Sequence, residues 1–406
     1  MAALQPVRGT KDLIGEDQRK HRHIIDTARR ISALYGFEEW QTPIFEATEV
    51  FSRTLGDTSD VVTKEMYSFP DRGGDSLTLR PEGTAGVARA LVSNGLTQSL
   101  PQKVFYAGPM FRYERPQRGR QRQFHQIGAE LIGPSEPLAD AEVIAMGWHI
   151  LRELGVADGV VLEINTLGDL ESRTAYRAAL VEYFGAHRDA LSEESVKRLQ
   201  HNPLRILDSK DLGDKALMNE APKMESFLST GASHFYADLK RHLERLGIRY
   251  RENPHIVRGL DYYSHTAFEF VTDQLGAQGT VLAGGRYDGL IAEMGGPTTP
   301  AIGWAAGIER LAELIEAPNT PVAPVVVIPA GVDCEARAHN FAQALRRSGV
   351  RADMAYRGDL KRRLERAVKL GAKYAVFVLP VTLALRDLEA GTQSDLEWDQ
   401  LIEYFK

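Results

Sequence analysis

The stretch of sequence from Phe111 to Gln126 decides the fold, and it consists of the residues FRYERPQRGRQRQFHQ. It holds five arginines within eleven positions, and Gly119 lies near its middle. Apolar segments flank it at residues 103–106 and 126–132. This pattern predicts a strand, a long basic loop and a second strand. Because the arginine guanidinium is planar and donates several hydrogen bonds to phosphate or carboxylate, we predict a hairpin that clamps a nucleoside triphosphate or a nucleic-acid end.

The alternative interpretation of this hairpin is a solvated loop whose arginines only keep the surface charged. Typical exposed faces mix lysines with glutamates, whereas these arginines are interspersed with aromatic and amide residues. The composition therefore favours a binding loop.

The overall composition limits the class of protein. A chain of 406 residues is too long for one ordinary core, so two or three domains are expected. Apolar residues make up 43% and charged residues 26%, as in soluble globular proteins. A net charge of −6 argues against non-specific coating of nucleic acid, although a local basic patch can still dock phosphates.

Cysteine use and hydropathy indicate the compartment. Cys334 is the only cysteine, so an intrachain disulfide and a cysteine-based zinc site are excluded, and a reducing cytoplasm is expected. The first ten residues lack an apolar signal region, and nowhere do eighteen apolar residues run together. Neither export nor membrane insertion is indicated.

Periodicity outlines the elements along the chain. Residues 171–247 are largely helical and polar, and we interpret them as an insertion between two halves of a catalytic core, residues 1–170 and 248–317. The segment 317–321 predicts a linker. Beyond it, in residues 321–406, strands and helices alternate, which predicts a small α/β domain with a mainly parallel sheet. In the core, helices are expected at 16–35, from 85, at 138–154 and from 308, and strands at 38–41, 76–80, 160–165, 267–270, 279–283 and 301–307.

Three further motifs suit substrate binding. They are LRPEGT at 79–84, VRGLDYYSHTAFE at 257–269 and AGGRYDGL at 283–290. A carboxylate beside glycine at a strand end suits an ammonium group, and adjacent glycines let backbone approach a ligand closely. Each motif taken alone has a simpler structural explanation. The 79–84 motif fits a helix N-terminus, the tyrosines of the 257–269 motif fit core packing, and the glycines of the 283–290 motif fit a tight turn. No Gly-Lys-Ser/Thr run and no dinucleotide fingerprint is present.

Together with VRGTKD at 7–12 and the segment 303–310, these motifs resemble the histidyl-tRNA synthetases, a family of class II aminoacyl-tRNA synthetases. The resemblance covers essentially the whole chain. It implies an α/β protein whose α+β core has the class II antiparallel sheet flanked by helices, followed by an anticodon-binding α/β domain. It also implies a homodimer packed through the first helix and the strand that ends at Pro43. The chain departs from the family after Pro380, where relatives have a longer connection.

The resemblance implies roles for single residues. Arg112 and Arg258 are the implied catalytic residues: Arg112 binds the ATP α-phosphate, and Arg258 contacts both the substrate carboxylate and that phosphate. ATP would also be bound by Glu114, Phe124 and Arg310, and the tRNA acceptor end by Gln117 and Arg120. The residues implied in histidine binding are Glu82, Gly83, Thr84, Arg112, Gln126, Glu130, Arg258, Tyr262, Tyr263 and Tyr287.

The expected activity is ATP-dependent ligation of histidine to its cognate tRNA through a histidyl-adenylate. Magnesium would arrive with ATP, and no metal ligated by the protein itself is expected. The alternative is a synthetase-like regulatory subunit of ATP phosphoribosyltransferase, which binds histidine without charging tRNA. Such paralogues usually lack the C-terminal domain and have an eroded histidine loop. This chain has both residues 321–406 and the Arg258–Asp261 motif, which favours the enzyme.

Overall fold

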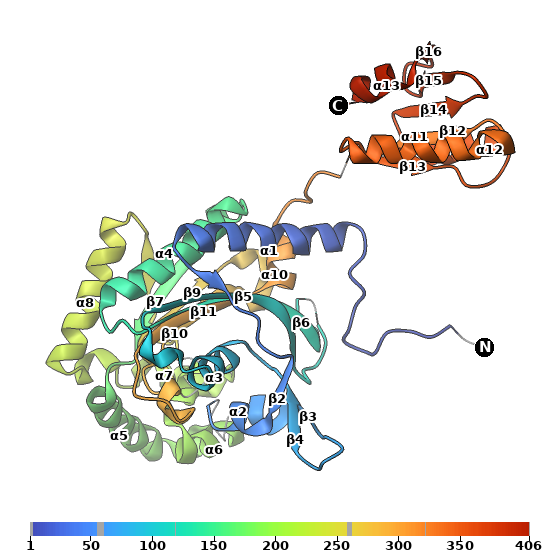
Figure 1. Ribbon diagram of the computed structural model, residues 1–406. Helices are drawn as coiled ribbons and strands as arrows, with labels where there is room; N and C mark the ends of the chain where they lie inside the picture. The colour runs from blue at the N-terminus through green and yellow to red at the C-terminus, as the bar shows by residue number, and fades with distance from the viewer. Residues whose placement is uncertain (1–2, 55–60, 118, 258–261, 321, 406) are drawn as a thin grey trace. The chain divides into compact units, whose positions relative to one another are not determined.

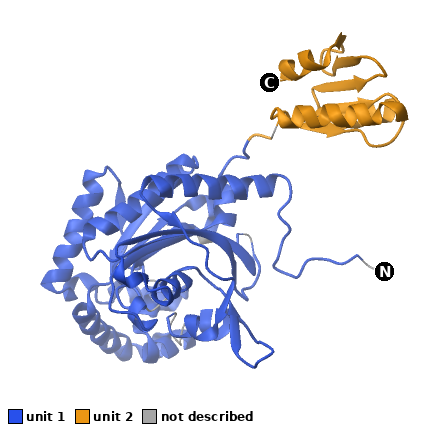
Figure 2. Cartoon of the chain, in the orientation of Figure 1, with its two compact units in different colours: residues 1–318 blue, residues 319–406 orange. Residues whose placement is uncertain are grey.

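The computed structural model describes residues 3–54, 61–117, 119–257, 262–320 and 322–405 (Figure 1). The chain forms two compact units, Met1–Pro318 and Asn319–Lys406 (Figure 2). In the described part of the chain, no helix has the length and apolar character needed to cross a membrane.

Within the described residues, the first unit is built on an eight-stranded sheet in the order β1-β5-β6-β11-β10-β9-β7-β8. Neighbouring strands are antiparallel, apart from the parallel pairs β1–β5 and β7–β8 at the two edges. This confirms the predicted antiparallel sheet and the strand–loop–strand hairpin, which is β5–β6. The bounds are β1 Glu38–Glu39, β5 Gln102–Phe111, β6 Gln123–Ile132, β7 Val161–Thr166, β8 Tyr250–Glu252, β9 Ser264–Val271, β10 Thr280–Arg286 and β11 Ala301–Gly307.

Helices cover both faces of this sheet. One apolar cluster joins the sheet to α1 (Glu16–Leu34), α4 (Pro137–Glu153), α8 (Thr230–Arg245) and α10 (Ile308–Leu314). Figure 1 shows α1 and α4 lying across that face. A second cluster on the other face includes α2 (Thr48–Ser52), α3 (Thr84–Ser93) and α9 (Leu290–Glu293). A small sheet accompanies it, in the order β2-β4-β3, with β2 Phe45–Ala47, β3 Tyr67–Pro70 and β4 Ser76–Leu79.

Helix α1 illustrates how the sequence sets an element. Ile24, Ala28 and Ile31 recur at helical spacing and are fully buried, which fixes the face that packs on the sheet. The helix ends at Leu34, and Gly36 two residues later has a φ of 77°. Glycine adopts this left-handed conformation without steric cost, so it acts as the stop signal that the sequence predicts.

The chain between β7 and β8 is helical, as expected. Helices α5 (Leu170–Ala186), α6 (Glu193–His201) and α7 (Leu212–Glu220) share an apolar cluster of their own. Helix α8 differs, because Leu239 and Leu243 are buried in the cluster of the large sheet. The segment therefore combines a separate small core with one helix that packs on the large sheet.

The second unit has a five-stranded sheet among its described residues, in the order β13-β12-β14-β15-β16. The pairs β12–β13 and β12–β14 are parallel, whereas β14–β15 and β15–β16 are antiparallel. The expectation of a mainly parallel sheet was wrong for the edge formed by β15 and β16. Only a short turn after Val378 separates β14 from β15, whereas a parallel crossover needs about a dozen residues. Helices α11 and α13 pack with one apolar cluster and α12 with another. The bounds are β12 Val325–Pro329, β13 Ala352–Met354, β14 Tyr374–Val378, β15 Leu383–Asp387, β16 Gln393–Leu396, α11 Glu335–Arg347, α12 Leu360–Lys369 and α13 Trp398–Phe405.

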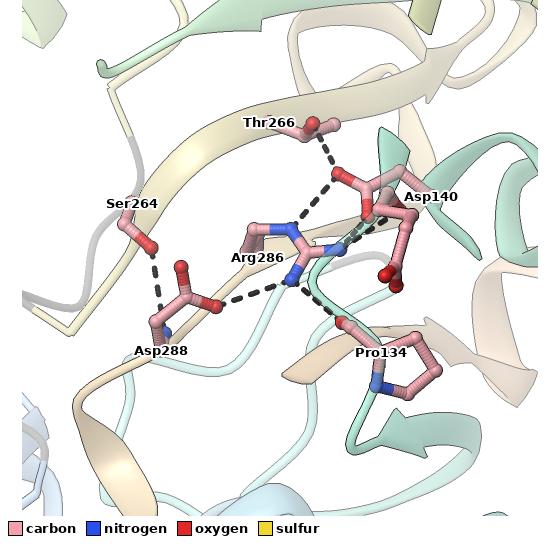
Figure 3. A network of polar contacts seen from close by, with 7 residues as sticks. Pro134, Asp140, Ser264, Thr266, Arg286 and Asp288 are labelled. Carbon is pink, nitrogen blue, oxygen red and sulfur yellow. Dashed lines mark hydrogen bonds and ion pairs between the residues drawn. The ribbon is translucent and has the colours of Figure 1, made fainter. Parts of the chain in front are cut away.

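A buried ion pair connects the sheet to the helix layer. The guanidinium of Arg286, at the end of β10, contacts the carboxylate of Asp140 on α4, and both side chains are almost fully buried (Figure 3). Thr266 Oγ1 donates a hydrogen bond to Asp140 Oδ2 at 2.5 Å. Arg286 also donates to the Pro134 carbonyl oxygen at 3.0 Å and to Asp288 Oδ1 at 3.2 Å. Such a network is stable only while every member has its partner.

We predict that Asp140→Asn lowers the free energy of unfolding of the first unit by about 3–5 kcal/mol, because it leaves a buried guanidinium without a counter-ion. Urea denaturation measures this loss. The matched control is Glu153→Gln, which removes an exposed pair with Arg30 and should leave the midpoint unchanged. Equal midpoints for Asp140→Asn and the parent would contradict the assigned role.

Candidate active site

A cavity of about 310 Å³ lies between the β5–β6 hairpin, strands β10 and β11 and the start of α10. Predicted site residues that line it are Glu82, Thr84, Arg112, Glu114, Arg120, Phe124, Gln126, Tyr262 and Arg310. Five others that the structure describes do not line it, namely Gly83, Gln117, Glu130, Tyr263 and Tyr287. The fold thus brings residues predicted for ATP and for histidine to the same cavity. Arg258 lies outside the described residues, and its catalytic role stays a prediction.

Arg112 follows β5 directly and is held by the main chain. Its Nε donates to the Pro81 carbonyl oxygen at 2.9 Å, and its guanidinium lies 5.3 Å from the centre of the Phe124 ring. The nearest carboxylate oxygen, on Glu114, is 3.9 Å from its Nη1. The guanidinium is therefore fixed in direction while one side faces the cavity, as a phosphate ligand requires.

The tip of the hairpin is closed by its own main chain. Gln117 and Arg120 exchange two N–H···O bonds of 3.1 and 2.9 Å, and Gly119 beside them has a φ of 68°. Arg120 Nη1 donates to Glu114 Oε2 at 2.9 Å. The residue predicted to bind adenine is therefore paired with a residue predicted to bind tRNA. Arg118, also in this loop, lies outside the described residues.

Arg310 brings a third cation to the cavity from the first turns of α10. Its Nη1 donates to the Thr280 carbonyl oxygen at 2.6 Å. Burial lowers the pKa of Arg310, and the neighbouring charges of Arg120 and Arg112 lower it further. Like charges brought together in a partly enclosed space favour binding of an anion that relieves their repulsion. The arginine cluster is suited to a polyphosphate.

Glu82 lies at the start of α3 and is buried. Its two carboxylate oxygens accept the N–H groups of Thr84 at 2.6 Å and Ala85 at 2.8 Å, which are otherwise unpaired at a helix N-terminus. Burial raises the pKa of Glu82, and these hydrogen bonds and Arg112 oppose the rise. The same carboxylate also lines the cavity, so its place at the helix terminus is compatible with the predicted role in substrate binding.

Glu130 is buried behind this wall, with 1% of its surface exposed. Its Oε1 accepts hydrogen bonds from Thr84 Oγ1 at 2.8 Å and from the Tyr106 hydroxyl at 3.3 Å, and its Oε2 accepts the Tyr287 hydroxyl at 2.5 Å. Burial raises the pKa of Glu130 to about 8, although these hydroxyls oppose the rise. The register of β6 with β11 places Gly303 opposite Glu130, where a Cβ would overlap the carboxylate.

Three tyrosines surround this carboxylate side of the cavity. The Tyr262 ring lies 4.6 Å from Tyr263 and 5.7 Å from Tyr287, centre to centre. Burial raises the pKa of Tyr262 and of Tyr287 well above the usual range, so both hydroxyls stay protonated and can donate. Tyr262 lines the cavity, and the other two tyrosines pack behind it.

Gln126 supplies an open acceptor. Its Oε1 is buried and finds no hydrogen-bond partner among the residues that the structure describes. Gln126 lines the cavity. Since a buried unpaired acceptor costs about 1–3 kcal/mol, its presence at the cavity wall points to a ligand donor.

Tyr106 and Glu269 are among the residues of this site that sequence reasoning missed. Tyr106 on β5 donates to Glu130, and a Cβ on Gly83 or Gly128 would overlap its ring. Only the paired register of β5 and β6 reveals that contact. Glu269 on β9 also lines the cavity and accepts the Thr280 hydroxyl at 2.7 Å. It was the last residue of the 257–269 motif, and its acidic side chain within an apolar strand was the available signal.

Comparison with known proteins agrees with this geometry. Residues 9–311 match the histidyl-tRNA synthetase family, and residues 324–406 match an anticodon binding domain family. The chain is 63% identical to a histidine--tRNA ligase of Gluconacetobacter diazotrophicus, covering 100% of this chain and 99% of the relative. It is 56% identical to one of Rhodospirillum rubrum, covering 100% and 99%.

Solved structures give the same result. The crystal structure of S. aureus histidyl-tRNA synthetase aligns with a TM-score of 0.83 at 34% identity, covering 99% of this chain and 100% of that one. A Bacillus halodurans protein described as an ATP phosphoribosyltransferase regulatory subunit/histidyl-tRNA synthetase aligns with a TM-score of 0.69 at 22% identity, covering 93% and 98%. That second likeness concerns the fold alone. The family match over most of the chain and the full-length relatives show that the chain belongs to the histidyl-tRNA synthetase family.

Proposed function

We propose that this chain ligates histidine to its cognate tRNA at the cost of ATP. A carboxylate oxygen of histidine attacks the α-phosphorus of ATP, the bond to the β-phosphate oxygen breaks, and pyrophosphate leaves. A hydroxyl of the terminal ribose of the tRNA then attacks the carbonyl carbon of histidyl-adenylate, and AMP leaves. The observation that best supports this proposal is that residues predicted to bind ATP and histidine line the same cavity. They are Arg112, Arg310, Glu82, Thr84 and Gln126.

On the ATP side, we assign Arg112 and Arg310 to the phosphates. Both guanidinium groups are held by main-chain carbonyl oxygens, so their charge is already in place when negative charge builds up at the α-phosphate. Phe124, against which Arg112 packs, is suited to stack on adenine. Glu114 would accept the adenine amino group, which requires that its pair with Arg120 opens.

Magnesium fits the same cavity, because the carboxylate of Glu269 lines it and Mg²⁺ prefers oxygen ligands. When bound with ATP, the ion would neutralise phosphate charge and help orient the triphosphate.

On the histidine side, we assign the ammonium group to Glu82 and Thr84 and the imidazole to Glu130 and the tyrosines. A carboxylate that accepts an imidazole N–H selects against isosteres that lack this donor. Hydroxyl groups of the chain already donate hydrogen bonds to Glu130. Substrate binding would replace one of these donors by the imidazole N–H, and the open Gln126 Oε1 would gain a donor.

We extend the proposal to partners that the family implies. The tip residues Gln117 and Arg120 would contact the acceptor end of tRNA, and residues 321–406 would bind the anticodon. The chain would act as a homodimer through α1 and the segment up to Pro43, in the cytoplasm. The strand expected to end at Pro43 is shorter in the structure, where β1 covers only Glu38–Glu39. The working parts of the chain would be residues 1–170 and 248–317 as catalytic core and 171–247 as insertion.

The first test is ATP–pyrophosphate exchange with each amino acid and without tRNA. We predict exchange with histidine only, because the assigned pocket pairs a buried carboxylate with aromatic side chains, which suits the N–H and the flat ring of an imidazole. Histidine binding without exchange would support the regulatory alternative. Exchange with another amino acid would contradict the pocket assignment while leaving the ATP assignment intact.

A second prediction concerns Arg112. Arg112→Ala should lower the rate of histidine-dependent exchange by roughly 10²–10³-fold, since it removes a preorganised donor to the transition-state charge. The control is Arg115→Ala in the same loop, where the side chain is exposed and lines no part of the cavity. Parallel losses in the two variants would mean that loop structure, and not Arg112 chemistry, is being measured.

A third prediction links affinity to stability at Glu130. Its pKa of about 8 in the folded protein exceeds the ordinary value of 4.5, so between these pH values the folded state holds a proton that the unfolded chain has lost. Its contribution to the free energy of unfolding therefore falls as the pH rises from 4.5 to 8. Glu130→Gln should raise the KM for histidine at least tenfold and yet stabilise the empty protein at pH 8.

The measurement is urea denaturation of both proteins at pH 5 and pH 8, together with exchange kinetics. The stability advantage of Glu130→Gln should be about 1 kcal/mol or more at pH 8 and smaller at pH 5. An unchanged KM, or the same stability difference at both pH values, would be inconsistent with a buried substrate-binding carboxylate.

A further inference from the structure

A second cavity, of about 300 Å³, adjoins the active site between α1, the hairpin and α10. Its wall includes His21, His125 and Glu309. These residues come from three segments that are distant in the sequence: His21 from α1, His125 from β6 and Glu309 from the first turn of α10. Glu309 also lines the active-site cavity, but none of the roles proposed above for the ligase chemistry is assigned to these three side chains.

The three side chains converge closely. One potential ligand atom of each lies within 4.8 Å of the others. His125 Nδ1 is 2.9 Å from Glu309 Oε1, and the two imidazole rings lie 5.2 Å apart at 85°. Ligand atoms around a tetrahedral zinc ion, at bond lengths of about 2.0–2.1 Å, are separated by roughly 3.3 Å. A small closing movement of His21 would bring the set to that spacing.

The simpler interpretation is that His125 and Glu309 form a structural pair. Glu309 also accepts the His125 main-chain N–H at 3.0 Å, which anchors the carboxylate. This pair does not explain His21. Its side chain is only 5% exposed, on the same face of α1 as the apolar Ile24 and Ala28. Within the described part of the chain its ring makes no hydrogen bond, although it contacts the His125 ring. His21 lines the cavity, and one of its ring nitrogens lies close to the anchored carboxylate of Glu309 and to His125, as a metal ligand would.

The neighbouring cations leave room for a metal ion. Lys11 and Lys20 line the same cavity, and each is already engaged: Lys11 Nζ lies 2.5 Å from Asp17 Oδ2, and Lys20 Nζ donates to the Ala312 carbonyl oxygen at 3.2 Å. In these contacts, neither lysine is paired with the carboxylate of Glu309. Two imidazoles and one carboxylate select borderline metals such as Zn²⁺ over Mg²⁺, which prefers oxygen ligands.

We propose that His21, His125 and Glu309 form a binding site for a divalent transition metal of the zinc class. The ion would join α1, the return strand of the hairpin and the helix that carries Arg310. His125 lies between Phe124 and Gln126, and Glu309 directly precedes Arg310. A bound ion would therefore hold both ATP-binding segments to the first helix. This site is separate from magnesium that arrives with ATP.

The test uses the full chain without an affinity tag, stripped of metal with a chelator and then dialysed. We expect calorimetric titration with Zn²⁺ to show one site per chain, and Co²⁺ to give the visible absorption of a nitrogen- and oxygen-ligated ion. His21→Asn should weaken Zn²⁺ binding at least tenfold. The matched control is His23→Asn, which removes an exposed histidine two residues away on the same helix and should leave the affinity unchanged.

Two results would overturn the proposal: no stoichiometric Zn²⁺ binding by the parent protein, or equal affinity in His21→Asn and the parent. If circular dichroism shows that His21→Asn does not fold, the Co²⁺ spectrum of the parent decides alone, and its absence counts against the site. Failure of this test leaves the ligase proposal intact, because the exchange assay needs none of these ligands.

Discussion

The buried carboxylate of Glu130, on strand β6 of the large sheet, needs hydrogen-bond donors and space from the residues around it. Glu130 cannot be hydrated, so it depends on hydroxyl donors from three elements: Thr84 of α3, Tyr106 of β5 and Tyr287 after β10. It also depends on the bare backbone of Gly303 on the neighbouring strand. A slip of β6 against β11 by one residue would bring a side chain against the carboxylate and turn it to the other face. The fold and the pocket are thus specified by the same register.

The helix layer on the opposite face supports this pocket from behind. Arg286 and Tyr287 are adjacent in the chain. Arg286 is fixed by Asp140 of α4 (Figure 3), and the Tyr287 hydroxyl donates to Glu130. The buried ion pair therefore holds the backbone from which the pocket tyrosine projects. Thr266, whose hydroxyl donates a hydrogen bond to Asp140, lies on β9, shortly after the tyrosine pair at 262–263. The ion pair that stabilises one face of the sheet and the pocket on its other face are therefore connected through the consecutive residues Arg286 and Tyr287.

The sequence predicted those features that are set by residues close together in the chain, and it missed contacts between residues far apart in the chain. The hairpin around Gly119, the end of α1 at Gly36 and the 301–307 strand all followed from nearby residues. The family resemblance supplied Arg112, Glu82 and Arg310, which the structure brings to one cavity. Tyr106 was missed because its partner is 24 residues away. The His125–Glu309 contact, 184 residues apart, was equally invisible. The antiparallel edge at β15 was mispredicted because helix–strand alternation was given more weight than the short turn before it.

The division of the chain near Pro318 has a consequence for how a long nucleic acid is held. Each unit has its own apolar core, and a single crossing of the chain connects them. On the proposed function, a tRNA bound through its anticodon to one unit is presented to the other at a raised effective concentration, set by the reach of the connecting segment. Each contact can then be weak and quickly released, while both together are selective. The connection, which takes no part in the chemistry, would thereby govern how long an uncharged tRNA is retained and how readily the charged product departs.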